Sequence, residues 1–313
     1  MSLTQRIVKA LEAILKAVEA SGSSAMADGM DCAHDTIYRA LLIDSILAKV
    51  SEIAIGLKML LGGLEGGYLV LDDTVIARSG RGKMWLPKLR DGNGHYCYGF
   101  GIVLLIWTDG KVRIPLKIKL YFGEVSKQEL ALELLAWAKE KGLKPDYVLF
   151  DSWYGSKKIL KQIYAYGWSF VTRLKKNRVL RGKQLKRHRG PYWTKVGKLR
   201  GMDFEVKIVR RGKKYYVTND LDLEDKEIIE HYKVRQAIEE VIRGLKQELG
   251  WQGFRYRTEQ TIGGHLGLGV VAYGLIEVAR RESKQSFYRY RRGLISGRID
   301  PPLDLLDSLL QTA

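Results

Sequence analysis

The stretch 147–151, YVLFD, is a run of four apolar residues that ends in an acid. A wholly apolar strand is typical of the centre of a sheet, where both faces are covered. An amphipathic helical pattern precedes it at 127–141, and a helical segment, 155–166, and a strand, 168–174, follow it. Strands that alternate with helices predict an α/β domain with 147–150 as a central strand.

More strands are expected before this stretch. The segment 67–73, GYLVLDD, has the pattern of a strand that ends in two acids. Segments 96–107 and 111–121 have the pattern of two long strands, and Asp109-Gly110 between them is a strong signal for a hairpin turn. The sequence therefore predicts a strand and a β-hairpin ahead of the central strand.

The N-terminal region, residues 1–62, has a helical pattern with a Gly/Ser break at 21–24. Within it, 31–42 (DCAHDTIYRALL) fits the second helix of a helix-turn-helix, with Asp35 or Thr36 near its N-cap. This region has nearly balanced charges, which is a poor electrostatic match to DNA. A possible DNA-binding helix-turn-helix and a plain helical bundle therefore stay open as alternatives.

The composition indicates a globular protein with a polyanionic partner. Hydrophobic residues make up 46% of the 313 residues, and the net charge is +18. Nucleic acid is the first candidate partner and an anionic membrane surface the second. Cys32 and Cys97 form no CxxC pair, which suits a reducing cytoplasm, where a DNA-binding protein would associate with the nucleoid. The apolar stretch 261–278 contains His265 and Glu277, and we interpret it as a buried core helix, with no membrane partner.

The excess positive charge is confined to one segment. Residues 155–215 contain 20 lysines and arginines and two acids, an excess that equals the net charge of the whole chain. Aromatic residues lie among these charges, and basic groups and aromatic rings are the groups that bind phosphates and unpaired bases. We predict that 175–222 is a basic, β-rich insertion that binds DNA, with contacts from Lys175, Lys176 and Arg178. A solvated surface is the alternative.

Two acids follow separate strands. Asp73 closes the segment 67–73, and Asp151 closes 147–150. Groups at the ends of strands in an open α/β sheet converge at one edge, and carboxylates suit Mg²⁺ or Mn²⁺. For either acid alone, a helix-capping or turn aspartate is an equal alternative.

A third acid lies in a helical pattern that begins near Asp225 and runs to about Glu248. On a helical wheel the opposite side of this helix is apolar, and one polar arc of about 80° carries one acid among bases and a tyrosine. That pattern suits a metal ligand beside bound phosphates, although a solvated face is also consistent with it. The residues of the arc are Tyr232, Arg235, Glu239, Arg243 and Lys246.

The spacing Tyr-x2-Arg-x3-Glu-x6-Lys, at 232, 235, 239 and 246, resembles the signature of prokaryotic insertion-sequence DDE transposases of the insertion-sequence-four type. The resemblance runs from about Tyr68 to Val278, with Asp73-Thr74 and Phe150-Asp151 at the matching strand ends. It implies a ribonuclease H-like core, a mixed sheet flanked by helices, with a β-rich insertion. The expected divisions are 1–62, 63–174, 175–222, 223–280 and a C-terminal tail, 281–313.

The resemblance also implies roles. Asp73, Asp151 and Glu239 would be the catalytic acids and the ligands of two Mg²⁺ (or Mn²⁺) ions. Asp72 and Glu240 would be neighbours of these acids without that role. Tyr232, Arg235 and Lys246 would hold phosphates of DNA, and the helical wheel adds Arg243 to them.

The predicted function is therefore DNA transposition by cleavage of element ends and strand transfer. Two element ends must be held together for this reaction, so a homodimer in a synaptic complex with DNA is expected. One alternative is a ribonuclease H-like nuclease without strand transfer. Another is an inactive, transposase-derived DNA-binding protein, which should have lost an acid, although none is missing here.

Overall fold

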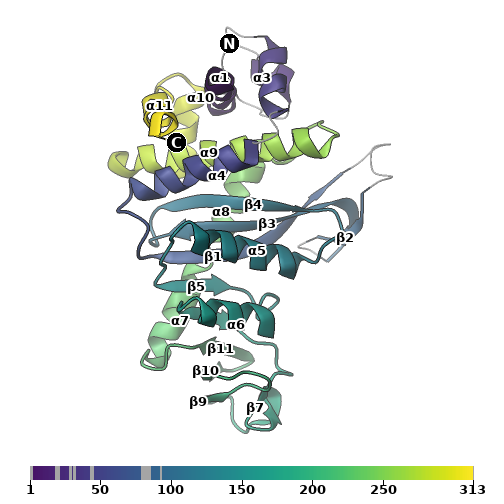
Figure 1. Ribbon diagram of the computed structural model, residues 1–313, viewed down its shortest axis with the longest axis vertical. Coiled ribbons are helices and arrows are strands. Elements are labelled where there is room, and N and C mark those ends of the chain that lie inside the picture. The colour runs from purple at the N-terminus through teal and green to yellow at the C-terminus, as the bar shows by residue number, and fades with distance from the viewer. Residues whose placement is uncertain are drawn as a thin grey trace.

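The computed structural model describes residues 3–17, 22–27, 30, 33–42, 46–78, 86–91 and 94–312. Its centre is a mixed sheet of nine strands, with helices on both faces and along one edge (Figure 1). The strand order is β2-β3-β1-β5-β6-β11-β10-β9, and β4 pairs with β3. The strands of this sheet are β1 (Tyr68–Ala77), β2 (Lys88–Arg90), β3 (Tyr96–Thr108), β4 (Arg113–Tyr121), β5 (Tyr147–Phe150), β6 (Phe170–Arg173), β9 (Tyr192–Lys198), β10 (Glu205–Arg211) and β11 (Lys214–Thr218).

The expected α/β fold is confirmed in its main parts. β5 is central, and it runs parallel to β1 and β6. The β3–β4 hairpin turns at Asp109-Gly110, where Asp109 Oδ1 accepts hydrogen bonds from the N–H groups of Lys111 and Val112. Gly110 has a φ of +93°, a conformation that favours glycine.

Helices α5 and α6 lie on one face of the sheet, and α7 and α8 lie on the other (Figure 1). α5 (Lys127–Glu140) begins with a capping box between Ser126 and Glu129, and α6 (Lys157–Ala165) begins at the N-cap Ser156. These caps satisfy backbone N–H groups and fix where each helix starts above the sheet.

The 225–248 segment forms two helices where the sequence predicted one. α7 (Asp225–Val234) ends before α8 (Ala237–Glu248) begins, and the N–H groups of Arg235, Gln236, Ile238 and Glu239 bond to carbonyls three residues back. This tighter turn changes the rotation per residue, so the wheel angles between Tyr232 and Glu239 were wrong in detail. No Gly or Pro marks the break; it lies where Arg235 reaches β1.

The basic segment is part of the main sheet. It is β-rich, and its strands β9, β10 and β11 continue the main sheet through β6. Only β7 (Val179–Leu180) and β8 (Lys183–Gln184) form a small sheet of their own, and a 3-10 turn, η2 (Leu185–Arg187), follows them. The basic surface and the strand that follows Asp151 are therefore parts of one continuous sheet.

The remaining helices gather at the β4 side of the sheet (Figure 1). α9 is long and apolar enough to cross a membrane by length and composition, but 89% of its most apolar window is buried inside the protein. It therefore serves as the core helix that was expected, packed on α4 and β4. These helices are α1 (Leu3–Lys16), α2 (Ser23–Ala27), α3 (His34–Leu41), α4 (Ile46–Met59), α9 (Glu259–Ser283), α10 (Phe287–Ile295) and α11 (Leu303–Thr312).

Two further details concern α3 and the C-terminal region. α3 begins at His34 with Ala33 as its N-cap, so Asp35 and Thr36 lie near the N-cap, in the first turn; Asp31 and Cys32 lie outside the described residues. The expected C-terminal tail is helical, and it is tied to the core by the fully buried Arg291. The Arg291 guanidinium donates to backbone carbonyls at the end of α1 and to that of Glu248 on α8.

Candidate active site

The site lies where the parallel pairing of three strands stops. The last paired residues are Leu71 with Phe150, and Phe150 with Thr172. The residues that follow these are Asp72 on β1, Asp151 after β5 and Arg173 on β6. Together they form one row across the three strands. β1 itself continues to Ala77 against β3, so the acids of β1 do not close the strand as predicted.

The contacts of two tyrosines identify the face on which this row lies. Tyr68 and Tyr147 are register partners at the start of β1 and β5, and both contact His231 of α7. The Tyr68 hydroxyl lies 2.8 Å from His231 Nδ1, and the rings of Tyr147 and His231 are 4.5 Å apart. Side chains alternate along a strand, so Asp72 and Asp151, four residues later, lie on this same α7/α8 face.

Asp72 is held by the residue between the two helices. Arg235 Nη1 donates to Asp72 Oδ2 at 2.8 Å, and Arg235 Nη2 donates to Glu239 Oε1. Arg235 thus joins β1 to the acid of α8. Burial raises the pKa of the Asp72 carboxyl to about 7, and the charges of Asp73 and Asp151 add to this, whereas the Asp73 N–H and the Arg235 guanidinium oppose it.

Asp73 points to the opposite face. Its Oδ2 binds Lys127 Nζ at the start of α5, and its Oδ1 accepts a hydrogen bond from the hydroxyl of Tyr154 at 2.9 Å. Tyr154 is fully buried ahead of α6, and burial together with the Asp73 charge raises its pKa, so it stays a donor. The structure therefore does not bring Asp73 and Glu239 together, as the predicted set of catalytic acids requires. Instead, the guanidinium of Arg235 pairs with both Asp72 and Glu239.

Asp151 is fixed by its own loop. Its Oδ1 accepts the N–H of Trp153 at 2.7 Å, and the Thr172 hydroxyl donates to the carbonyl of Phe150 at 2.7 Å. These bonds hold the end of β5 against β6, while the side chain of Trp153 stays exposed. The position of Asp151 at the C-terminal end of the central strand agrees with the sequence prediction.

The two glutamates of α8 have different partners. Glu239 has a side chain that is 47% exposed and pairs with Arg235. Glu240 pairs with Arg113 of β4 at 2.7 Å, and the backbone N–H of Arg113 donates to the buried Glu277. Glu240 thus belongs to the contact between α8, β4 and α9, away from the acids of β1.

The predicted phosphate-binding residues are spread along this face. The ring of Tyr232 lies within 5.4 Å of the Arg173 guanidinium and 5.8 Å of that of Arg235. Lys246 Nζ, half-buried, donates to the backbone carbonyl of Val75 on β1 at 3.1 Å, whereas Arg243 is exposed.

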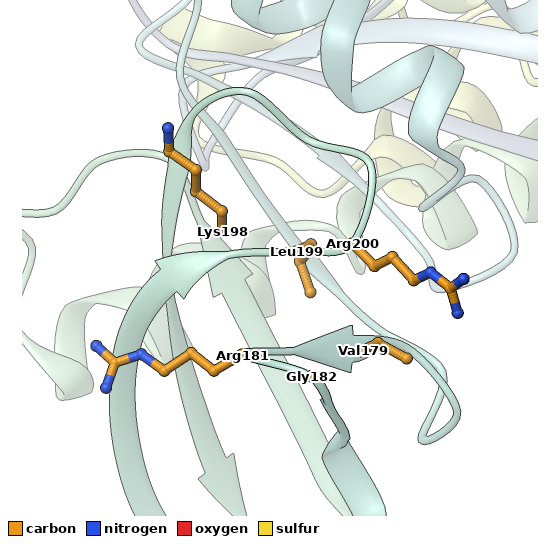
Figure 2. Close-up of a pocket in the computed structure, with 6 residues that line it drawn as sticks. All are labelled: Val179, Arg181, Gly182, Lys198, Leu199 and Arg200. Atoms are coloured by element: carbon orange, nitrogen blue, oxygen red, sulfur yellow. The ribbon is translucent and has the colours of Figure 1, made fainter.

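The basic strands carry a separate hollow. It measures about 530 Å³ and lies between β7 and the end of β9 (Figure 2). The basic side chains on its rim extend outward in different directions (Figure 2). Lys175 and Lys176 nearby are exposed, whereas Arg178 is half-buried. The hollow is lined by Val179, Arg181, Gly182, Lys198, Leu199 and Arg200.

The acids of the row have the chemistry of a metal site, but a cationic side chain lies among them. In the part of the chain that the structure describes, no three His, Cys, Asp or Glu side chains are grouped to hold a metal ion. Arg235 lies between Asp72 and Glu239 and pairs with both carboxylates. Carboxylate oxygens are the donors that Mg²⁺ and Mn²⁺ prefer, so the side chains of Asp72, Asp151 and Glu239 are of the chemical type that fits such an ion.

The comparisons with known proteins show the family and the fold of the chain. The family model of the transposase DDE domain matches residues 65–275, which include the row, α7 and α8. A solved structure, the cryo-EM piggyBac transposase synaptic complex with hairpin DNA, contains a chain with the same fold. The TM-score is 0.54 at 12% identity, over 99% of this chain and 71% of that one. No curated protein matches the sequence.

Proposed function

Because this chain belongs to the family of transposase DDE domains, we propose that it cuts and joins DNA at the ends of a mobile element. The observation that carries the proposal is the row of Asp72 and Asp151, over which Arg235 and Glu239 lie on the α7/α8 face. Two acids on neighbouring strands opposite a helix acid are the groups that metal-dependent phosphoryl transfer requires. The finer membership, in the insertion-sequence-four type, rests on the spacing of Tyr232, Arg235, Glu239 and Lys246.

The acid of β1 in this proposal is Asp72, in place of Asp73. Asp72 shares a face with Asp151 and a partner with Glu239, whereas Asp73 is bonded to Lys127 and Tyr154 behind the sheet. The raised pKa of Asp72 supports the choice, because a buried carboxyl beside other acids gains most from an added cation.

Asp72, Asp151 and Glu239 would hold two Mg²⁺ or Mn²⁺ ions, which, when bound, activate water or a 3′-hydroxyl and stabilise the leaving 3′-oxygen. Arg235 would release the two acids and turn to a phosphate, for which its planar guanidinium has the geometry. Arg243 and the basic surface around Lys175 and Lys176 would hold DNA farther from the bond that is cut. Lys246, which contacts the carbonyl of Val75 on β1, would contribute positive charge beside the acids.

Strand transfer needs two element ends at once, so we propose that the chain acts as a homodimer on DNA. The piggyBac structure is a synaptic complex with hairpin DNA, and that precedent supports an assembly of this kind. A nuclease without strand transfer is the second candidate, since it would need the same acids.

The test is a cleavage and strand-transfer assay with purified protein, Mg²⁺, and a duplex that carries the inverted repeats flanking the gene. We expect a nick at the repeat end and, with supercoiled plasmid as target, a joined product. Cleavage without joining would favour the nuclease. Neither product in Mg²⁺ or Mn²⁺, from protein that binds the duplex, would contradict the proposed function.

A further inference from the structure

The third member of the row, Arg173, has no role in the family signature or in the sequence predictions. It follows Thr172 at the end of β6, as Asp151 follows Phe150 and as Asp72 follows Leu71. Register partners project their side chains to the same face of a sheet. The row across β1, β5 and β6 therefore consists of two acids, Asp72 and Asp151, followed by one base, Arg173.

Ring contacts independently assign Arg173 to the α7/α8 face. Its guanidinium lies 5.4 Å from the centre of the Tyr232 ring on α7. Tyr216, its antiparallel partner on β11, also packs on Tyr232, with the ring centres 5.3 Å apart. Arg235 contacts the same ring at 5.8 Å, so Tyr232 joins the two guanidinium groups at the edge of the site.

The two arginines differ in their partners. Arg235 is committed to Asp72 and Glu239, both within ion-pair distance. Arg173 is only half-buried. The salt bridges and hydrogen bonds of the described residues give its guanidinium no carboxylate; its contact is the face of Tyr232. A guanidinium held in place by an aromatic ring, without an anion of its own, is ready to bind one.

We propose that Arg173 binds a phosphate of the DNA strand that enters the site, on the β6 side of Asp151. The inference rests on the proposed function and adds a substrate contact to it. A strand that reaches from the basic strands β9–β11 to the acids must pass β6, since β6 lies between them in the sheet. Arg173 would then set the position of the strand, while Tyr232 holds the guanidinium in place.

The experiment compares Arg173→Gln, Arg173→Lys and a control, Lys226→Gln, which removes one charge at an exposed position on α7 where Lys226 pairs with Glu230. The probe for affinity is a fluorescent duplex carrying the inverted repeats, titrated at several salt concentrations by anisotropy. Arg173→Gln should weaken binding about tenfold and reduce the salt slope by about 0.9. Arg173→Lys should keep the slope but lower kcat, because it lacks the fork geometry. Lys226→Gln should resemble wild type.

Other outcomes would overturn the inference. If Arg173 only packs on Tyr232, Arg173→Gln would lower the unfolding temperature and leave the salt slope and kcat unchanged. A slope change of equal size in Lys226→Gln would indicate a general charge effect. Failure of the proposed function is distinguishable, because then the wild-type protein itself would neither cut the repeats nor prefer them to unrelated DNA. Circular dichroism of each variant shows that the fold is kept.

Discussion

Asp72 and Asp73 are neighbours in one strand, yet they belong to opposite sides of the molecule. Asp72 faces α7 and α8 and is held by Arg235, while Asp73 faces α5 and is held by Lys127 and Tyr154. Asp72 shares Arg235 with Glu239 and lies in one row with Asp151, whereas Asp73 is bonded to Lys127 and to the buried Tyr154. Two identical side chains thus differ in chemistry because the strand alternates.

The most direct test of the difference between Asp72 and Asp73 is to replace each aspartate in turn. Asp72→Ala should reduce cleavage of the inverted-repeat duplex by more than about a hundredfold, because it removes a proposed metal ligand. Asp73→Ala should keep cleavage within about tenfold of wild type, while its free energy of unfolding falls by about 1–3 kcal/mol, because Lys127 and Tyr154 lose their buried acceptor. Single-turnover cleavage and urea unfolding measure the two effects.

Metal binding compares the roles of Asp72 and Asp73 without measuring catalysis. Mn²⁺ titrated by calorimetry into Asp72→Asn should bind more weakly than into Asp73→Asn, with wild type as reference. If Asp73→Asn is the variant that loses Mn²⁺ binding and cleavage, then the assignment from the Asp73-Thr74 motif is right and the face argument fails.

The adjacent glutamates of α8 provide a second matched pair. Glu239→Gln should abolish cutting yet bind the repeats at least as well as wild type, because it removes a negative charge near phosphates. Glu240→Gln should still cut, since Glu240 pairs with Arg113 at the α8–β4 contact. A gel shift and a cleavage assay on both proteins check this; loss of cutting in Glu240→Gln alone would contradict it.

The side of the sheet that carries Asp73 should affect stability rather than the reaction. Tyr154→Phe removes the hydroxyl that donates to Asp73 at 2.9 Å. We expect the free energy of unfolding to fall by about 1–2 kcal/mol, with kcat nearly unchanged. A large fall in kcat, in protein whose unfolding midpoint is near that of wild type, would show that the Asp73 side takes part in the reaction.

The smallest effect is expected from the basic surface. Lys175→Gln with Lys176→Gln should lower DNA affinity for any sequence and reduce the salt slope by about 0.9 for each phosphate that is no longer neutralised. Anisotropy titrations with repeat and unrelated duplexes measure it. An unchanged slope would mean that these exposed lysines are only solvated, in contrast to Arg173 in the site.

The sequence by itself determined most of the elements and the broad family. The apolar run before Asp151 defined a central strand because only a strand covered on both faces is wholly apolar. The Asp109-Gly110 signal located the hairpin because turns depend on a few local residues. The spacing around Glu239 indicated a DDE transposase, and the match of residues 65–275 to the transposase DDE domain confirms that broader family.

Only the tertiary structure decided which side chains come together in the site. Apolar residues lie on both faces of β1, so no local pattern shows whether Asp72 or Asp73 faces α8. The break at Arg235 lacks any Gly or Pro signal, and the pairing of β11 with β6 depends on residues some 45 positions apart. Arg173 was likewise hidden among 20 basic residues of its segment, since its place beside Asp151 is a property of register. The register of the strands and the face to which each side chain points are set by packing between distant segments, so they cannot be predicted from composition and spacing.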